Sequence, residues 1–396
     1  KIKGVSFIKE IKRFHPNGDL AAHLIGFSNI DNIGLQGVEL EYDKYLRGSK
    51  GMAQFLRDAK MRDLMIEKDF VPPKDGNHIV LTIDETIQFI AEKALEKAYV
   101  KHNAASASVI VMDPKTGEIL AFANRPTFNP DKPDASPMEN RTNRAVAFVY
   151  EPGSVFKIVT AAAGLETKVF KEEDIIFCEN GKYRVANHIL HDHDPLGSLS
   201  YRDVVVHSSN IGITKIAQKI GPDKVYEYAH KFRFGMKTGI GMIGEVNGML
   251  KPPSRWSKTT IGAIPIGQEV TVTSIQLVAA IAAIANDGKY MRPYYVKAIK
   301  DPNGFMVQEF HPKEETQIIH PDIARRLKSI LQAVVDEGTA TSAKMKDITA
   351  AGKTGTAQKV VDGKYSHSKF VASFIGFAPA DDPKLAVFVT VDTPHP

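Results

Sequence analysis

Ser154 and Lys157 are the first residues in this sequence whose types and spacing could support catalysis. Pro152 and Gly153 precede the pair, and a small, apolar run follows it to about Leu165. This pattern predicts a buried helix that begins here. Residues three positions apart lie on one face of a helix, so the Lys157 amine should reach the Ser154 hydroxyl. Because a serine hydroxyl needs a base at neutral pH, the pair predicts a nucleophile beside its base.

A serine three residues before a lysine is more often a helix cap beside an unrelated lysine, so other motifs must decide. Ser208, Ser209 and Asn210 follow an apolar run at residues 204–206. A further motif consists of Lys353, Thr354, Gly355 and Thr356. Together the three motifs, in this chain order, resemble the active-site set of the serine penicillin-recognising enzymes.

Other segments extend the resemblance over nearly the whole chain. Residues 113–121, 239–241 and 266–269 are similar to class B penicillin-binding proteins. The resemblance implies an α+β penicillin-binding and serine β-lactamase-like transpeptidase domain, residues 73–396. It also implies a small, elongated, non-catalytic pedestal of the dimerisation type, residues 1–72. The boundary falls at residues 71–76, where two prolines and a glycine favour an extended connector.

The motif residues suggest separate catalytic roles. Lys157 can act as the base only while it is neutral, so we expect burial and a neighbouring cation such as Lys353 to lower its pKa. Ser208 could relay a proton between either lysine and the leaving amine, and the Asn210 amide could hold a substrate carbonyl. No histidine has a spacing that marks it as the base.

A carboxylate-binding patch is predicted on the strand that carries the third motif. Gly355 has no side chain, so a ligand backbone could lie close to the strand. The hydroxyls of Thr354 and Thr356, with the charge of Lys353, would bind a carboxylate. The resemblance implies an oxyanion hole made by the backbone N–H groups of Ser154 and Thr356, where loss of one donor costs about 100- to 1,000-fold in rate.

The resemblance implies a peptidoglycan D,D-transpeptidase. A D-Ala-D-Ala stem peptide would acylate Ser154, D-Ala would leave, and an amine of a neighbouring stem would take the acyl group. β-Lactams would stall at the acyl-enzyme. Residues 26–31 and 34–39 resemble the N-terminal module of division and sporulation enzymes, so we expect septal cell-wall synthesis. A serine β-lactamase is the nearest alternative, although no carboxylate can be assigned to deacylation; a β-lactam sensor or an inactive scaffold is another.

Short strand and helix patterns indicate how the motifs are positioned. Strand patterns are found at residues 78–82, 108–112, 118–123, 351–357, 371–377 and 385–391. Apolar residues recur with helical spacing over residues 84–101. Residues 201–220 and 274–285 are predicted to be helices of an all-helical half. About five strands packed on helices indicate an antiparallel sheet, with the site between the sheet and the helical half.

Composition excludes some functions and leaves others to the resemblance. Lys and Arg number 51 and Asp and Glu 46, with no dense basic run, so we predict no nucleic-acid partner. Cys178 is the single cysteine, which excludes an intrachain disulfide. His188, His191, Asp192, His193 and Asp194 form a cluster in a predicted loop. Since the mechanism needs no metal, we predict neither metal nor cofactor.

The ends of the chain prompt two expectations. An apolar pattern at Val5, Phe7 and Ile8 suggests that a segment precedes Lys1. The resemblance implies a single membrane anchor there, an extracytoplasmic catalytic domain, and a membrane glycosyltransferase and divisome proteins as partners. It also implies a C-terminal helix over the sheet, whereas this chain stops soon after its last predicted strand.

Overall fold

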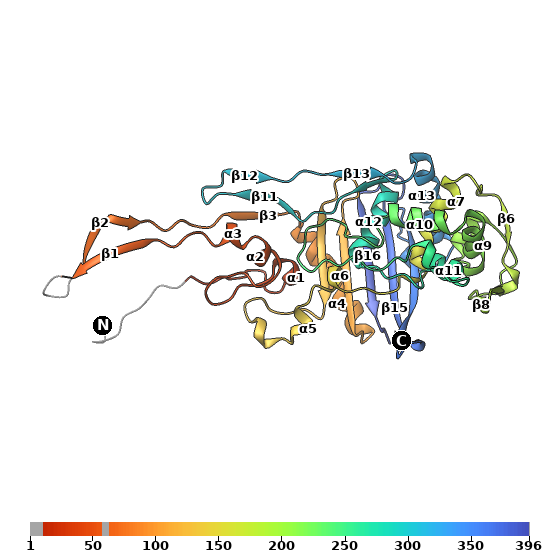
Figure 1. Ribbon diagram of the computed structural model, residues 1–396, viewed down its shortest axis with the longest axis horizontal. Helices are drawn as coiled ribbons and strands as arrows, with labels where there is room; N and C mark the ends of the chain where they lie inside the picture. The colour runs from red at the N-terminus through yellow and green to blue at the C-terminus, as the bar shows by residue number, and fades with distance from the viewer. Residues whose placement is uncertain (1–10, 58–62, 396) are drawn as a thin grey trace. The chain divides into compact units, whose positions relative to one another are not determined.

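The computed structural model describes residues 11–57 and 63–395, and its contacts divide the chain into two compact units (Figure 1). Of the described residues, the first unit comprises 11–57, 63–82, 127–141 and 296–311, and the second comprises 83–126, 142–295 and 312–395. Val5, Phe7 and Ile8 lie outside the described residues. The expected domain boundary at residues 72 and 73 stays a prediction, because units of contact need not coincide with domains of a family.

A five-stranded antiparallel sheet forms the centre of the second unit. Its strands are β4 (Ser106–Met112), β5 (Ile119–Arg125), β14 (Ala351–Val361), β15 (Lys364–Ala378) and β16 (Leu385–Asp392). The order β14-β15-β16-β4-β5 places two early strands beside three late ones, as the orange and blue arrows of Figure 1 show. The predicted α+β class and its five strands are confirmed.

Helix α4 (Glu85–Lys101) packs on one face of this sheet. Asp84 caps it by accepting the Ile87 N–H at 2.9 Å, and the predicted helix is thereby confirmed. Ala91 and Leu95 of α4 pack with alternate residues of the strands. On β16 these are Leu385, Val387, Val389 and Val391. These four residues are only half-buried, while Ala386 and Phe388 between them are fully buried.

Helix α12 (Ser274–Ala285) is buried at every position. It packs against β4, β15 and β16 and against α13 (Pro321–Asp336). Residues 274–285 were expected in the all-helical half, and these contacts with the sheet show that this expectation was wrong. A helix without a polar face must be covered on all sides, and the sheet offers the larger apolar surface. Thr273 and Gln276 close a capping box at its start.

The all-helical half is built around the first two motifs. It contains η2 (Gly153–Phe156), α7 (Lys157–Glu166), α8 (Tyr201–Val206), α9 (Asn210–Ile220), α10 (Pro222–Lys231), α11 (Thr260–Ala263) and η5 (Ile264–Ile266). Helix α7 packs against α9, α10 and α13. Short strands at its edge are β6 (Ile175–Phe177), β7 (Lys182–Val185), β8 (His188–His191) and β9 (Ser198–Ser200). Further short elements of the second unit are α6 (Arg144–Ala147), η3 (Glu179–Gly181), η4 (Pro253–Arg255) and η6 (Thr341–Ala343).

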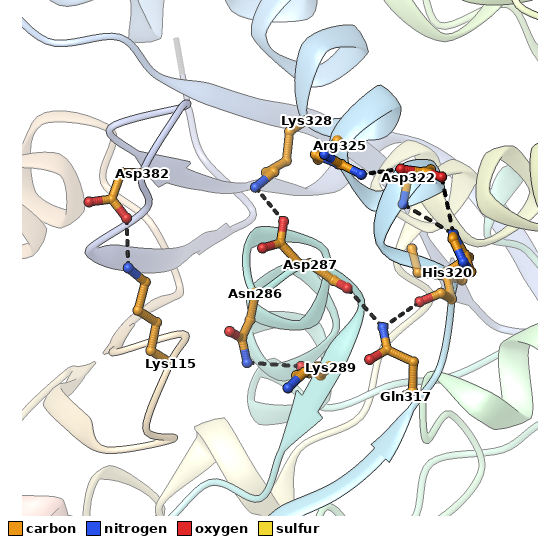
Figure 2. Close-up of polar contacts among 11 residues, drawn as sticks. Lys115, Asn286, Asp287, Lys289, Gln317, His320, Asp322, Arg325, Lys328 and Asp382 are labelled. Atoms are coloured by element: carbon orange, nitrogen blue, oxygen red, sulfur yellow. Dashed lines mark hydrogen bonds and ion pairs between the residues drawn. The ribbon is translucent and has the colours of Figure 1, made fainter.

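Ion pairs and hydrogen bonds connect the turns and helix ends on the outside of the second unit. Figure 2 shows Lys115, between β4 and β5, paired at 2.6 Å with Asp382, between β15 and β16. It also shows Lys328 of α13 paired at 2.8 Å with Asp287, just after α12. Strand β13 (Glu314–Gln317) pairs with β10 (Lys289–Met291). Gln317 of β13 donates to the Asp287 carbonyl at 2.8 Å (Figure 2). The end of α12 is thus fixed to its neighbours.

The first unit contains a small sheet assembled from distant segments. Strand β3 (His78–Leu81) pairs with β11 (Val296–Lys300), which pairs with β12 (Met306–Glu309). The strand predicted near residue 78 is confirmed, but its partner was not predicted. The other elements are α1 (Ala22–Ile25), α2 (Gly37–Glu41), α3 (Asp43–Leu46), β1 (Met52–Arg57), β2 (Asp63–Val71), η1 (Pro133–Ala135) and α5 (Met138–Arg141). No helix within residues 11–57 and 63–395 is long and apolar enough to cross a membrane.

Candidate active site

Ser154 lies in η2, a 3-10 turn that leads directly into α7. Gly153 before it adopts φ 61°, and its N–H donates to the Gly267 carbonyl at 3.2 Å. A Cβ on Gly267 would fall 2.2 Å from the Gly153 carbonyl oxygen, so the two backbones meet without room for a side chain. Val155 and Phe156 are fully buried, whereas Ser154 is partly exposed. The buried neighbours thus fix the turn, and Ser154 is the residue of the turn that stays partly exposed.

Lys157 is the first residue of α7, and its side chain is fully buried. Its amine donates to the Ser208 carbonyl at 2.5 Å, to the Asn210 Oδ1 at 2.7 Å and to the Ser208 Oγ at 3.1 Å. Within residues 11–57 and 63–395, no hydrogen bond joins this amine to the Ser154 hydroxyl. Three partners fill the positions around the nitrogen, so one must be released before Lys157 can accept a proton from Ser154.

Ser208 occupies the break between α8 and α9, in a strained backbone conformation. Its φ of 57° lies in the left-handed region, which costs about 1–3 kcal/mol for a residue other than glycine. This conformation lets both the carbonyl and the hydroxyl of Ser208 contact Lys157. Ser209 then caps α9 by accepting the Gly212 N–H at 2.8 Å. The polar turn predicted from the sequence is therefore bonded to the first motif.

Lys353 extends from β14 into the same cluster, and it too is fully buried. Its amine donates to the Ser208 Oγ at 2.8 Å. Ser208 therefore lies between two lysines. Burial lowers the pKa of Lys353 to about 7. Burial also lowers the pKa of Lys157 well below its ordinary value, the positive charge of Lys353 lowers it further, and the negative charge of Asp192 opposes this.

A neutral Lys157 amine fits its three partners well. A neutral amine has two N–H groups and one lone pair. The Ser208 carbonyl and the Asn210 Oδ1 can only accept, so they take the two N–H groups. The Ser208 hydroxyl can donate to the lone pair while its oxygen accepts from Lys353. The geometry thus offers a continuous proton path from Lys353 through Ser208 to Lys157.

Asp192 is a contact residue of the site that the motif analysis missed. Its carboxylate accepts from the Ser209 hydroxyl at 2.7 Å and from the N–H groups of Asn210 and Ile211 at 2.5 and 3.1 Å. The His191 carbonyl accepts from the Asn210 Nδ2 at 2.8 Å. The Asn210 amide is therefore held at both ends, and its second N–H group makes no hydrogen bond within residues 11–57 and 63–395. Sequence spacing could not reveal this, because residues 191 and 192 reach the motif from another hairpin.

Close packing explains why residue 355 is a glycine, and this packing was not predicted from the sequence. A Cβ at this position would lie 2.7 Å from the Ser373 Oγ, 2.9 Å from the Val155 Cγ1 and 3.0 Å from the Pro152 carbonyl oxygen. The missing side chain thus allows β14 to pack against η2 beside Ser154. A ligand backbone lying along Gly355 stays a prediction.

The remaining hydroxyls of the third motif lie near the surface. Thr354 is partly exposed, and its Oγ1 donates to the Oγ1 of Thr339 at 3.2 Å. Thr339 follows α13 and was not singled out from the sequence. Thr356 is exposed, and its carbonyl oxygen would lie 3.3 Å from a Cβ on Gly153. All three motifs therefore meet within one unit of the chain.

The histidine-rich stretch makes other contacts. His188 and His191 are exposed on β8, and His193 pairs with Asp194 at 3.3 Å on the surface. Over the part of the chain that the structure describes, no group of three His, Cys, Asp or Glu side chains is arranged to hold a metal ion. Asp192 instead contacts the second motif, as described above.

Comparison with known proteins agrees with this architecture. Residues 107–395 match the penicillin binding protein transpeptidase domain family, and residues 1–81 match the penicillin-binding protein dimerisation domain family. The chain therefore belongs to the penicillin-binding proteins that combine these two domains, and the resemblance drawn from the motifs is confirmed.

Relatives span the chain almost completely. Stage V sporulation protein D of Bacillus subtilis is 39% identical over 99% of this chain and 62% of its own length. Peptidoglycan D,D-transpeptidase FtsI of Escherichia coli is 31% identical over 100% of this chain and 65% of its own length. The crystal structure of penicillin binding protein 3 of Mycobacterium tuberculosis in complex with ampicillin is 32% identical, with a TM-score of 0.88, and the match covers 96% of this chain and 83% of that one. The chain thus spans about two thirds or less of these two curated relatives.

Proposed function

We propose that this chain is the extracytoplasmic part of a peptidoglycan D,D-transpeptidase with Ser154 as its nucleophile. The observation that carries the proposal is the buried network in which Ser208 and Asn210 bind Lys157 and Ser208 also binds Lys353. Two lysines with lowered pKa values beside a serine can move a proton at neutral pH without a histidine. Family membership supports the same conclusion.

In the proposed first step, the Ser154 Oγ attacks the carbonyl carbon of the penultimate D-Ala of a stem peptide. Lys157 takes the hydroxyl proton. To do so, its amine must release one of its three contacts, and we propose that this is the longest, to the Ser208 Oγ at 3.1 Å. The peptide C–N bond breaks, and terminal D-Ala leaves as an amine. The contact between Lys157 and the Ser208 Oγ then re-forms, and that amine receives its proton from Lys157 through Ser208.

In the proposed second step, an amine of a neighbouring stem peptide attacks the ester carbonyl. The C–O bond to Ser154 breaks, and the amine proton returns to the Ser154 oxygen by the same residues. The free N–H group of Asn210 would hold the donor backbone, and Thr354, Thr356 and Lys353 would face its terminal carboxylate. A β-lactam would acylate Ser154 in the first step and leave no amine to depart.

The wider setting is part of the proposal. Similarity to a stage V sporulation protein of Bacillus subtilis and to a peptidoglycan D,D-transpeptidase of Escherichia coli supports our proposal of a role in septal or spore cell-wall synthesis. We infer a membrane anchor on the N-terminal side, and a membrane glycosyltransferase and divisome proteins as partners. Cross-linking measured in vesicles with and without added glycosyltransferase tests the partnership. We expect cross-linking to depend on that enzyme; equal cross-linking in its absence would contradict the partnership.

Intact-protein mass after incubation with benzylpenicillin tests the nucleophile. The wild-type chain should gain one penicillin and keep it for hours. The Ser154→Ala variant should gain none, and Ser254→Ala, which changes an exposed serine, should behave as wild type. An adduct on Ser154→Ala would contradict the assignment.

The same time course separates the alternatives. An adduct that disappears within seconds, with loss of free drug, would identify a β-lactamase. A stable adduct without cross-linking of added stem peptides would identify a sensor. Release of D-Ala together with a new cross-linked product would support the transpeptidase.

A further inference from the structure

Thr339 lies on the short segment between α13 and β14 and contacts both the third motif and the end of α8. Its N–H donates to the Val206 carbonyl at 3.4 Å, two residues before Ser208. Its Oγ1 accepts from the Thr354 Oγ1 at 3.2 Å and from the Lys353 Nζ at 3.5 Å. Thr339 therefore connects the end of α8, through its backbone N–H, to the strand that carries the third motif, through its hydroxyl.

Among the residues that the structure describes, the hydrogen bonds of this hydroxyl leave its proton unused. A threonine hydroxyl has one proton to donate and two lone pairs to accept with. The contacts from Thr354 and Lys353 occupy the lone pairs. If the bond between the two threonines is reversed, the Thr354 proton is left instead. In either case the pair keeps one O–H donor for a molecule outside the protein.

The position of this donor favours an anionic group. Thr339 is exposed although its hydroxyl touches the fully buried Lys353. An acceptor placed against Thr339 would therefore be near a lysine amine as well. A hydroxyl donor next to a cation binds a carboxylate more strongly than a neutral carbonyl.

The backbone around Thr339 is tightly fixed. A Cβ on Gly338 would lie 2.5 Å from the Val206 carbonyl oxygen, so only glycine fits there. Ala340 on the other side is 2% exposed and donates its N–H to the Val334 carbonyl at 3.0 Å. A hydroxyl held in this way loses little entropy when it binds a ligand.

We propose that the Thr339 hydroxyl is a specificity-determining residue that donates to the free terminal carboxylate of the donor peptide. The inference rests on the proposed function and adds to it a group outside the three motifs. It explains how the site would prefer a peptide that ends in a free acid over the same peptide continued or capped.

Two thioesters test the inference, both on the complete chain. One is benzoyl-D-alanyl thioglycolate, whose leaving group bears a free carboxylate, and the other is its methyl ester. Thr339→Val keeps the shape and removes the hydroxyl, while Thr339→Ser keeps the hydroxyl. Thr341→Val, an exposed threonine two residues on, is the matched control. Thiol release gives kcat/KM for each pair.

We expect Thr339→Val to lower kcat/KM for the free acid by about tenfold and for the methyl ester by less than about twofold. Thr339→Ser should restore most of the loss. An equal fall for both thioesters, or no fall for either, would overturn the inference. If the wild-type chain reacts with neither thioester and forms no Ser154 adduct with penicillin, the proposed function itself fails.

Discussion

The carboxylate of Asp192 accepts the backbone N–H of Asn210 at 2.5 Å, while the side chain of Asn210 accepts from Lys157 at 2.7 Å. Asp192 thus positions a partner of Lys157, the proposed base, and its negative charge acts to raise the pKa of that lysine. The loop after β8 is therefore part of the electrostatics of the site.

Replacing Asp192 by Asn should slow acylation of Ser154 by about tenfold, because a neutral amide binds three donors less strongly than a carboxylate does. Loss of the negative charge should also lower the pKa of Lys157, so the rising limb of the pH–rate profile should move to lower pH. Stopped-flow acylation with a fluorescent penicillin measures both effects. Asp194→Asn, whose side chain is 73% exposed, is the control. An unchanged profile in Asp192→Asn would contradict the positioning role.

Removing the charge of Lys353 should move the rising limb of the pH–rate profile to higher pH. In the wild type, acylation should rise with pH as the lysine pair loses a proton, at a pH well below the ordinary value of 10.5. Lys353→Met removes a neighbouring cation and thereby raises the pKa of Lys157, so the limb should move to higher pH. The rate of the variant, although low, is measurable by adduct mass over hours. A shift to lower pH would show that Lys353 does not act on Lys157 through its charge.

Stability should also depend on Lys353. Its pKa is about 7 in the folded chain and about 10.5 when unfolded, so the unfolded chain binds more protons between these pH values. Wild-type stability should therefore rise with pH across this window, because the penalty for burying the amine is complete below about pH 7 and fades towards pH 10.5. The Tm of Lys353→Met relative to wild type should be higher at pH 6 than at pH 10. A difference in Tm that is constant with pH would contradict the lowered pKa.

Gly355→Ala should separate β14 from the turn that holds Ser154. The new Cβ would meet Val155 at 2.9 Å and Pro152 at 3.0 Å. We expect a loss of about 1–3 kcal/mol in the free energy of unfolding and at least about tenfold slower acylation. The double variant Gly355→Ala with Val155→Ala should destabilise by less than the sum of the single changes, because one contact is removed in both. Additive losses by chemical denaturation would indicate that the two positions do not touch.

The sequence predicted helices and strands best where a short local pattern of apolar residues determines the element. The strand pattern at residues 385–391 and the helix predicted over residues 274–285 correspond to β16 and α12. Apolar character alone could not say what would cover α12, and it was assigned to the wrong layer. The pairing of β3 with β11 joins distant segments that share no local signal.

The same limit applies to the site. Ser154, Lys157 and the later motifs were found because each has a short, recognisable spacing. Asp192 and Thr339 contact these motifs through tertiary structure, from a hairpin and from the end of a helix. A single Asp or Thr has no spacing to detect, so only the fold could reveal these two contacts.

Strand β4 pairs on one side with β5, its neighbour in sequence, and on the other with β16, so that Ala107 lies opposite Val391. During synthesis, the edge of β4 that pairs with β16 stays unpaired until almost the whole of the second unit has been made. Such long-range pairing slows folding and exposes a strand edge to association with other chains. The order of strands in this sheet therefore ties the covering of the β4 edge to the last part of the chain to be synthesised.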